Sequence, residues 1–386
     1  MTTTFAVFAP HFPPASAGGG PARSLDGLTT TAPADVDVLV LTSDRDEGAP
    51  ERLPVPRGRW TGHGRVPVLY ADLGNPLGVL RALASVRRRH PTHLYLNSFF
   101  HLRLSLVPRL LARAGWWRGA TVVVAPRGEF GSWALGSKGR KKRAFLRLHR
   151  LLGLHRGVLW HAATETEAAD IREVWGDSAQ VVVDLPRSPL PRLARRGGPP
   201  PSDAVQAVSL GRLTRLKGLD VVLRGLQSLP DGSRIHLDSY GPPEEPDLVA
   251  ECEEIARHLP EGVSWSYRGP LDHEHVQDTL SRYDVALLGT HGETFGHAVA
   301  EVLSVGCPLL VADTTPWTPV VAGGAGLVVP AVTPRAWTET ISRFLSLDTA
   351  DKARMRDAAA LAFEEAQASR GRHLFELVLD ADDAPR

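Results

Sequence analysis

The sequence predicts an α/β protein of two domains, each a parallel sheet covered by helices. Three observations lead to this prediction. The chain has 386 residues, enough for about two domains of ordinary size. Short apolar runs, typical of buried strands, alternate with longer stretches of helical periodicity in both halves. Between the halves, residues 186–203 are rich in Pro, Arg and Gly and are typical of a linker.

The expected strands are distributed over both halves of the chain. They fall at 5–8, 36–41, 66–70, 94–96, 121–125 and 158–161 in the first half, and at 207–210, 234–239, 264–267, 285–288, 308–312 and 326–329 in the second. We therefore expect a Rossmann-like domain over 1–185 and another over 204–365, facing each other across a cleft. Ligands of open α/β sheets bind outside the carboxyl ends of the strands, so candidate site residues are expected there.

The bulk composition excludes several function classes. A net charge of +1 gives no overall argument for a nucleic-acid partner. The two cysteines, Cys252 and Cys307, lie in apolar or helical contexts and are expected to be buried thiols of a reducing compartment. We expect no signal peptide, and no apolar run approaches the ~18 residues of a membrane span. A cytoplasmic protein is the resulting expectation.

Two glutamates flank a predicted loop-to-helix junction. The loop after the expected strand 285–288 carries Glu293 and ends at Gly296, and a helix is expected to begin near His297. A helix N-terminus presents unpaired N–H groups and a partial positive charge, which suit a phosphate. Glu301 would lie roughly 7 Å along the axis from Gly296, an offset suited to gripping a ribose diol. Glu293 would reach hydroxyls of a sugar beyond the diphosphate; the alternative is a capped surface helix with two solvated acids.

A basic loop follows the first expected strand of the second domain. Arg212 and Lys217 lie in it, and a helix is expected to start near Leu219. Arginine dominates the basic residues of this chain, so a lysine at 217 favours a specific role. Codon drift is the alternative explanation.

Together the two segments resemble the donor site of retaining family 4 glycosyltransferases, which have the GT-B fold. The family's E-x7-E motif matches Glu293 and Glu301 and is followed here, as in the family, by Gly306-Cys307-Pro308. The resemblance implies a nucleoside-diphosphate sugar as co-substrate and retention of anomeric configuration. It also implies that Arg212 and Lys217 hold the diphosphate, which together with Glu293 makes them the expected catalytic residues.

The remaining residues expected at the donor site come from the same loop and from the first domain. They are Thr294, Phe295, Gly296, His297 and Glu301 of the second domain, and Gly19 and Gly20 of the glycine-rich segment 18–24. The resemblance extends to that segment and to a P-R-G segment at 125–130. The glycines are expected to let backbone N–H groups approach the phosphates, with a flexible loop as the alternative. In GT-B proteins the last helix commonly returns to the first domain, so we expect residues of about 366–386 to pack there.

Three residues are expected on the acceptor side, namely Arg23, Arg127 and Glu129. Arg127 and Glu129 follow the expected strand 121–125 and should therefore face the cleft. They are expected to position the acceptor, and Glu129 is expected to assist with a proton. A salt bridge between neighbours or plain solvation is the alternative.

No metal cofactor is expected. The D-x-D strings at 35–37 and 44–46 lie early in the chain, far from the diphosphate motifs, whereas basic side chains and a helix N-terminus can stabilise the leaving group without metal. Two residue choices depart from the family pattern. Gly289-Thr290 replaces a usual Pro-Ser pair, which is expected to loosen the loop before Glu293, and Asp184 stands where Asn is common.

A basic segment at 138–156 is interleaved with leucines and phenylalanine. This pattern predicts an amphipathic helix able to rest on an anionic membrane surface, with Trp116-Trp117 dipping into the interface. The acceptor is then expected to be a glycan or a lipid-linked sugar extended into a surface polysaccharide. The alternative is a helix packed on the sheet with its charges in water.

Two other functions remain open at this point. One is a GT-B nucleotide-sugar epimerase, which would rearrange or hydrolyse its donor without an acceptor. The other is a non-catalytic sugar-nucleotide-binding subunit of an assembly complex.

Overall fold

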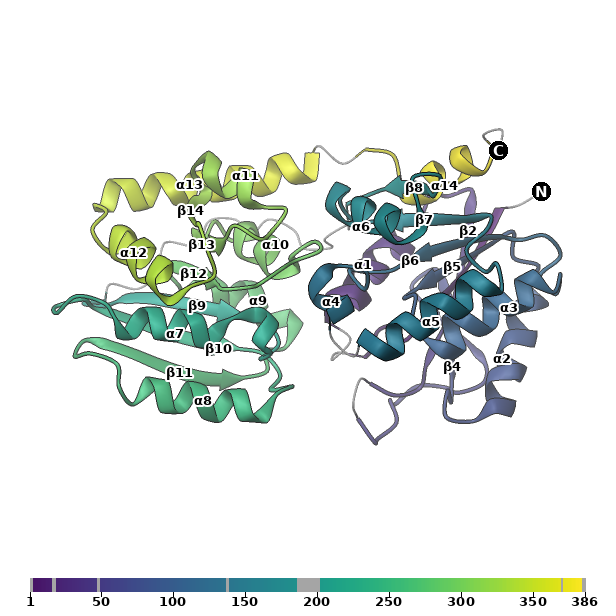
Figure 1. Cartoon of the computed structure of the whole chain (residues 1–386), viewed down its shortest axis with the longest axis horizontal. Coiled ribbons are helices and arrows are strands. Elements are labelled where there is room, and N and C mark those ends of the chain that lie inside the picture. The colour runs from purple at the N-terminus through teal and green to yellow at the C-terminus, as the bar shows by residue number, and fades with distance from the viewer. Residues whose placement is uncertain are drawn as a thin grey trace. The chain divides into compact units, whose positions relative to one another are not determined.

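The computed structural model describes residues 3–15, 19–46, 49–136, 139–185, 202–368 and 371–383. The chain divides into two compact units, one of residues 1–189 and 371–386 and the other of residues 190–370 (Figure 1). The boundary expected at 185/186 and the division at 189/190 thus differ by four positions, and most of the expected linker lies outside the described residues.

The first unit holds an eight-stranded sheet with the order β3-β4-β2-β1-β5-β6-β7-β8. Neighbouring strands are parallel, except that β3 runs antiparallel to β4 at the edge. The strands are β1 Thr3–Ala9, β2 Val36–Ser43, β3 Trp60–His63, β4 Val66–Ala71, β5 His93–Asn97, β6 Thr121–Ala125, β7 Val158–Ala162 and β8 Gln180–Val183. Every residue of the strands β5 and β7 is buried, because helices cover the sheet on both sides.

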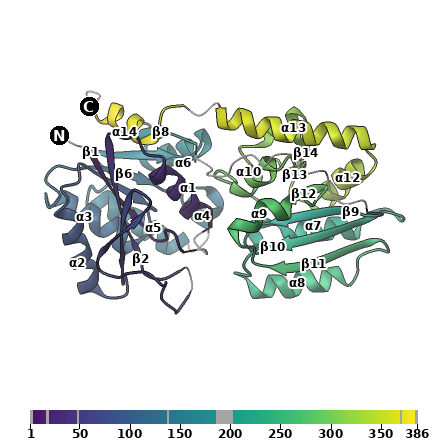
Figure 2. The same cartoon turned by 180° about the vertical axis from the view of Figure 1, so that it is seen from behind.

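Helices cover both faces of this sheet. Those of the first unit are α1 Gly19–Thr30, α2 Pro76–Arg87, η1 Leu102–Leu106, α3 Val107–Arg113, α4 Ser132–Gly136, α5 Gly139–Leu151, α6 Glu165–Trp175 and α14 Leu374–Asp383. One apolar layer contains side chains of α2, η1, α5 and α6, and the other contains side chains of α1 and α14. In Figure 1, α2, α3 and α5 lie before the sheet, and in Figure 2 they lie behind it.

The C-terminal helix α14 belongs to the first unit. Leu374, Phe375 and Val378 are completely buried in the layer that also contains α1. The ring of Phe375 stacks on Phe5 of β1, with centroids 4.2 Å apart. Burial of this kind gives about 1.5–3 kcal/mol per large apolar side chain, so α14 is part of the first core rather than an appendage.

Trp117 corrects one expectation about the first unit. Its side chain is 3% exposed within the apolar layer under α2 and α5, and its Nε1 donates to the Pro108 carbonyl at 3.0 Å. Trp117 therefore does not reach a membrane interface. Its neighbour Trp116 is half-buried and lies 4.8 Å from the guanidinium of Arg87, at the end of α2.

The second unit is a six-stranded parallel sheet with the order β11-β10-β9-β12-β13-β14. The strands are β9 Val205–Leu210, β10 Ile235–Tyr240, β11 Val263–Gly269, β12 Val285–Leu288, β13 Leu309–Ala312 and β14 Gly326–Val329. The helices are η2 Arg215–Lys217, α7 Leu219–Gln227, α8 Pro246–Ala256, α9 His273–Leu280, α10 His297–Ser304, α11 Thr318–Val320, η3 Val321–Ala325, α12 Pro334–Leu345 and α13 Thr349–Ala368.

Two helical layers sandwich this sheet as well. Side chains of α7, α8 and α12 share one core cluster, and those of α9, α10 and α13 share the other. The two parallel-sheet units confirm the expected α/β class, and α7 and α10 begin at Leu219 and His297 as expected. Strand order reverses between β9 and β12, so their carboxyl ends flank the crevice where open α/β sheets bind ligands.

Candidate functional site

A pocket opens at this crevice of the second unit. It is formed by the carboxyl ends of β9, β10 and β12, the loop before α7 and the first turn of α10. Its lining consists of Ser209, Leu210, Gly211, Arg212, Leu213, Lys217, Leu219, Ser239, Tyr240, Leu288, Gly289, Thr290, Glu293, Ala298 and Val299. Three residues expected from the sequence, Arg212, Lys217 and Glu293, thus share one pocket.

The two loops that carry these residues touch through glycines. Gly218 has a φ of +60°, and a Cβ built on it would lie 2.2 Å from the carbonyl oxygen of Gly289. A Cβ on Gly289 would in turn lie 2.7 Å from the Gly218 oxygen. No side chain fits at either position, because both contacts are with backbone atoms. The absence of side chains lets the Lys217 loop and the Glu293 loop pack directly together.

Lys217 and Glu293 form an ion pair across this contact, Nζ to Oε1. Their side chains are 25% and 17% exposed, so the pair is partly shielded from water. Opposite charges interact more strongly in such a place than at the open surface. The ammonium expected to hold a diphosphate and the carboxylate expected to meet a sugar are therefore neighbours.

Thr290 ties the loop before Glu293 to its surroundings, which overturns the expectation that Gly289-Thr290 loosens it. The Thr290 hydroxyl lies 3.2 Å from the Leu216 carbonyl oxygen and 2.9 Å from that of Gly292. The backbone N–H of His291 donates to the same Leu216 carbonyl at 2.7 Å. This segment is held by hydrogen bonds on the side of the Lys217 loop.

Arg212 is placed differently from Lys217. Its Nη1 donates to both carboxylate oxygens of Glu244, at 3.0 and 3.1 Å, and its side chain is 42% exposed. An exposed pair of this kind contributes about 0–1 kcal/mol to stability, so Arg212 can leave it at little cost. The guanidinium lines the pocket and is available to a ligand that outcompetes Glu244.

The first turn of α10 begins at Gly296, which has a φ of +83° and ψ of 64°. No side chain caps this helix, so its first N–H groups are not satisfied by a capping residue. Phe295 corrects part of the expected donor site. Its ring is 7% exposed and packs on Trp317, whose Nε1 donates to the Phe295 carbonyl. A ligand can meet Phe295 only through the backbone.

Glu301 lies in the second turn of α10 and is 3% exposed. Thr294 and His297 are half-buried at the start of the helix, and the His297 ring lies 4.8 Å from that of Phe295. Glu301 is not among the residues that line the pocket, whereas Glu293 is. The two glutamates of the motif thus differ in exposure to the pocket.

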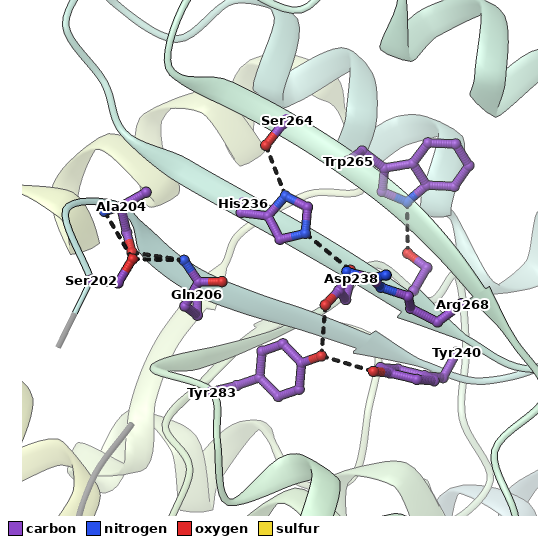
Figure 3. Close-up of polar contacts among 11 residues, drawn as sticks. Ser202, Ala204, Gln206, His236, Asp238, Tyr240, Ser264, Trp265, Arg268 and Tyr283 are labelled. Atoms are coloured by element: carbon purple, nitrogen blue, oxygen red, sulfur yellow. Dashed lines mark hydrogen bonds and ion pairs between the residues drawn. The ribbon is translucent and has the colours of Figure 1, made fainter. Parts of the chain in front are cut away.

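A partly buried chain of hydrogen bonds supports Tyr240, which lines the pocket (Figure 3). Its hydroxyl lies 3.0 Å from that of Tyr283, which donates to Oδ2 of Asp238 at 2.8 Å. Arg268 Nε at 2.7 Å and His236 Nε2 at 3.0 Å bind Oδ1 of the same carboxylate. Burial favours the neutral acid, but the hydrogen bonds from Arg268, Tyr283 and His236 outweigh it and lower the pKa of Asp238. Tyr240 is therefore anchored to a charged group in the sheet.

In the first unit, Gly19 and Gly20 do not form a loop. They are the first two residues of α1, and the Ser24 hydroxyl donates to the Gly20 carbonyl at 3.0 Å. Gly18 lies outside the described residues. Arg23, on the same helix, is half-buried. The expected glycine-rich loop, and its alternative of a flexible loop, are thus replaced over the described part by the N-terminus of a helix.

Arg127 follows β6 in the left-handed region, with a φ of 56°. Its Nε donates to Asn97 Oδ1 and its Nη2 to the Tyr95 hydroxyl, both at 2.8 Å. The Tyr95 hydroxyl in turn lies 2.6 Å from Nδ1 of His161. Burial and the charge of Arg127 lower the pKa of His161 to about 3, so this imidazole is neutral and accepts from Tyr95. Arg127 is held rigidly at the carboxyl ends of β5 and β6.

Glu129 does not have the free carboxylate that acceptor positioning or proton transfer requires. Its Oε1 accepts from the Ser98 hydroxyl at 2.7 Å, and its Oε2 accepts from the N–H groups of Phe99 and Phe100 at 2.5 and 3.3 Å. Burial raises the pKa of Glu129. Its role in the structure is to fix the loop after β5, which corrects the expectation from sequence.

Potential metal ligands are dispersed in the described part of the chain. Nowhere in those ranges do three His, Cys, Asp or Glu side chains converge as a metal site would require. Asp44 of one D-x-D string is buried and pairs with Arg52 at 3.0 Å. Both cysteines are buried free thiols, and burial raises the pKa of each to about 12.

The sequence of the second unit matches a known family. Residues 193–361 match the family described as glycosyl transferases group 1. The second unit carries a group 1 glycosyl transferase domain. The motif resemblance on which the site was predicted is thereby confirmed.

The curated relatives match only part of this chain. A D-inositol 3-phosphate glycosyltransferase of Xylanimonas cellulosilytica is 27% identical over 218 residues, which are 52% of this chain and 51% of the relative. One of Streptomyces scabiei is 28% identical over 173 residues, 43% of this chain and 38% of the relative. The chain thus spans about half the length, or less, of these relatives.

Solved structures resemble this chain over nearly its whole length. Sucrose-phosphate synthase of Thermosynechococcus elongatus has a TM-score of 0.69 at 16% identity, covering 98% of this chain and 97% of its own. HepE of Anabaena, solved with UDP and glucose, has a TM-score of 0.68 at 16% identity and covers 98% of both chains. At such low identity the likeness shows the fold, which is that of GT-B glycosyltransferases.

Two residues were missed from the sequence, namely Tyr240, which lines the pocket, and Glu244, which binds the pocket residue Arg212. Tyr240 ends β10, but the strand expected at 234–239 stopped one residue short of it. The Tyr-Gly-Pro sequence at 240–242, a bulky residue before a turn signal at a strand end, is the signal that could have identified it. Glu244 had no such signal, because its contact with Arg212 depends on how two loops fold.

Proposed function

We propose that this protein is a retaining glycosyltransferase. It moves a sugar from a nucleoside-diphosphate sugar to a hydroxyl of a glycan or lipid-linked acceptor, without a metal. The observation that carries the proposal is the Lys217–Glu293 pair in the pocket at the strand-order reversal of the group 1 domain. This pair places a cation beside a carboxylate that can accept hydrogen bonds, at the position where open α/β sheets bind ligands.

Lys217 and Arg212 can stabilise the negative charge that develops on the leaving group during glycosyl transfer. Cleavage of the bond between sugar and diphosphate leaves negative charge on the leaving group while the sugar becomes oxocarbenium-like. Lys217 and Arg212 line the pocket and stabilise that charge, and the uncapped N-terminus of α10 adds N–H donors. Once the bound donor has displaced Glu244 and Glu293, these donors are in place before the chemical step and need no further reorganisation during it.

The two glutamates of the motif are assigned to the two other parts of the donor, the transferred sugar and the ribose. Glu293 lines the pocket beside Lys217 and is assigned to the transferred sugar. Glu301 lies almost enclosed one turn further along α10 and is assigned to the ribose hydroxyls.

Retention is assigned to a front-face mechanism. Glu293 is the single carboxylate among the lining residues of the pocket, and it is assigned to hydroxyl groups of the sugar rather than to attack on the anomeric carbon. The leaving phosphate then takes the proton of the acceptor hydroxyl as the new bond forms on the same face. The chain needs no covalent glycosyl-enzyme intermediate for this route.

The curated relatives support transfer to a hydroxyl, since each is named a D-inositol 3-phosphate glycosyltransferase. The structure of HepE with UDP and glucose shows what one protein of this fold binds and favours the same class of donor here. None of the helices among the described residues combines the length and apolar character needed to cross a bilayer. We place the protein in the cytoplasm, where segment 138–156 meets anionic lipid at the inner face of the cell membrane and gives access to lipid-linked acceptors of polysaccharide synthesis.

The proposal is tested in two steps. A thermal-shift screen against nucleoside diphosphates should reveal one that stabilises the protein, by about 2.7 kcal/mol at a hundredfold excess over its dissociation constant. The corresponding radiolabelled sugar nucleotides are then incubated with and without membrane extract as acceptor. Transfer that requires the extract supports the proposal. Turnover without acceptor indicates an epimerase or hydrolase, and binding without turnover indicates a non-catalytic subunit.

A further inference from the structure

The charges of this chain are divided very unevenly. Between Asp72 and Glu165, residues 73–164 contain 17 Lys and Arg and one acid, Glu129. The rest of the chain contains 27 Lys and Arg and 42 Asp and Glu. Glu129, the single acid of this segment, is bound in the interior by Ser98 and by the backbone of Phe99. It therefore does not offset the positive charge at the surface. The near-neutral total conceals a strongly basic part of the first unit.

The helices of this segment share one side of the first sheet. Side chains of α2, η1 and α5 lie in a single apolar layer, and α3 continues directly from η1. Contacts link the helices in sequence. Arg87 of α2 lies over Trp116, which follows α3, at 4.8 Å, and Phe145 of α5 lies 5.4 Å from Phe100, which precedes η1. Figure 1 shows α5, α3 and α2 in succession before the sheet.

Exposed leucines are concentrated on the same helices. Of the nine large apolar side chains that are exposed among the described residues, seven lie here: Leu77, Leu80, Leu102, Leu110, Leu148, Leu151 and Leu152. Leu151 is 83% exposed and Leu77 is 62% exposed. Contiguous exposed apolar side chains in a soluble domain mark an interaction surface, whereas scattered ones do not.

Leucines and cations lie together on the outward faces of α5 and α2. On α5, Leu146 and His149 are buried, while Arg140, Arg147 and Leu148 are exposed. On α2, Val79, Leu83 and Val86 face the core, and Leu77, Leu80, Arg81 and Arg88 are exposed. The spacing of these residues places the leucines beside the arginines on the solvent side.

We propose that the outward faces of α2, η1, α3 and α5 form one docking surface for an anionic lipid bilayer. The surface is larger than the segment 138–156 and includes three helices that precede it, α2, η1 and α3. Arginines bind lipid phosphates while neighbouring leucines enter the acyl boundary. A nucleic acid would bind the cations but make no use of the leucines, and contact with the same surface of a second copy of this chain would bring like charges together. The inference is independent of the glycosyl transfer proposed above, because docking involves none of the pocket residues.

Vesicle co-sedimentation tests the docking surface. The full chain is mixed with vesicles of phosphatidylcholine alone or of phosphatidylcholine with phosphatidylglycerol, at low and high salt. The wild type should sediment only with the anionic vesicles, and less at high salt. Each cation near such a membrane contributes about fivefold to partitioning, so Arg140→Ala/Arg143→Ala/Arg147→Ala should lose on the order of a hundredfold. Far-UV circular dichroism confirms that each variant is folded.

Two further variants decide the extent of the surface. Leu77→Ser/Leu80→Ser on α2 keeps every charge and should weaken partitioning by at least about tenfold, because binding scales with the apolar area inserted. The matched control Arg257→Ala/Arg335→Ala/Arg354→Ala removes three exposed cations of the second unit, and Leu361→Ser removes its exposed leucine. Both controls should bind like wild type.

The contrary outcomes are distinct. Sedimentation that ignores lipid charge, or equal losses in the controls, overturns the proposal. A loss confined to the α5 variant overturns the inclusion of α2. Binding to soluble polyglutamate or duplex DNA but not to vesicles shows that the surface serves an acidic macromolecule instead.

Discussion

Lys217 and Glu293 form an ion pair although 76 residues separate them in the sequence. The contact exists because Gly218 and Gly289 let their loops meet without side chains between them. A donor diphosphate entering the pocket competes with Glu293 for the ammonium. The released carboxylate is then free to accept hydrogen bonds from the sugar, so binding of one half of the donor prepares the site for the other.

Removing the Lys217 ammonium should slow transfer by on the order of 10²–10³ in Lys217→Ala, because a preorganised charge at the leaving group is lost. Arg212→Ala should lose a similar factor. Initial rates at saturating donor measure both. Arg215→Ala is the matched control, since Arg215 lies in the same loop but binds Glu251 at 2.9 Å and is not part of the pocket lining. Full activity in Lys217→Ala would sink its assignment.

The glutamates should be separable by calorimetry with two ligands. Glu301→Ala should weaken the donor and the free nucleoside diphosphate alike, by about 1.5–3 kcal/mol, because both carry the ribose. Glu293→Ala should weaken the donor, while the free diphosphate binds at least as tightly because Lys217 no longer has a competing partner. Equal losses on both ligands in Glu293→Ala would contradict this division.

Activity should survive an excess of chelator. The expectation rests on the cations of the pocket and on Asp44, which is occupied by Arg52. Transfer is measured before and after dialysis against EDTA, with a metal-dependent transferase as the control. Complete loss that magnesium or manganese restores would refute metal independence.

Tyr283→Phe should destabilise the second unit by about 1–2 kcal/mol in urea unfolding, since Asp238 loses one of its donors and Tyr240 loses its anchor. The control is Tyr267→Phe, which removes a single hydrogen bond of 2.7 Å to the Gly241 carbonyl at the edge strand. We expect a smaller loss there. If Tyr267→Phe lowers the free energy of unfolding by as much, the hydrogen bonds that join Tyr240, Tyr283 and Asp238 contribute no more to stability than a single hydrogen bond elsewhere.

His101 should make stability depend on pH. Its Nδ1 accepts from the N–H of Leu104 at 3.0 Å, and burial followed by the charges of His11 and Arg103 lowers its pKa to about 4. Between about pH 6.5 and 4 the unfolded chain binds a proton that the folded chain does not, so stability falls as pH falls through this window.

His101→Asn keeps a capping side chain without this titration. The slope of unfolding free energy against pH should therefore decrease by up to about 1.36 kcal/mol per pH unit between pH 4 and 6.5. Urea unfolding at several pH values measures it. His90→Asn, an exposed position, is the control. An unchanged slope in His101→Asn would exclude His101 as the titrating group.

The regular part of the fold was predictable because buried parallel strands are apolar runs with helices between them. The edge strands β3 and β8 were not predicted, for a physical reason. Trp60–His63 and Gln180–Val183 are four residues long and largely half-exposed, so neither is the buried apolar run that identifies a central strand. Their pairing partner, rather than their own sequence, makes them strands.

The candidate site was predictable to the level of which loops meet at a strand end. Whether a side chain there is free or occupied depends on its three-dimensional neighbours. Glu129 is the clearest case. Its position after β6 predicted a carboxylate that faces the cleft, but in the structure this carboxylate accepts hydrogen bonds from the N–H groups of Phe99 and Phe100. Sequence position indicated the region, but the hydrogen-bond partners decided the role.

The burial of α14 in the first core has a consequence for synthesis on the ribosome. The last helix supplies Leu374, Phe375 and Val378 to a layer built on β1, so the first unit cannot complete its core until these residues have left the exit tunnel. The second unit is contiguous and needs no later segment. Contrary to the usual N-terminal-first order, it is the unit able to fold first. Until then the nascent first unit exposes the apolar face around Phe5, a surface that chaperones recognise.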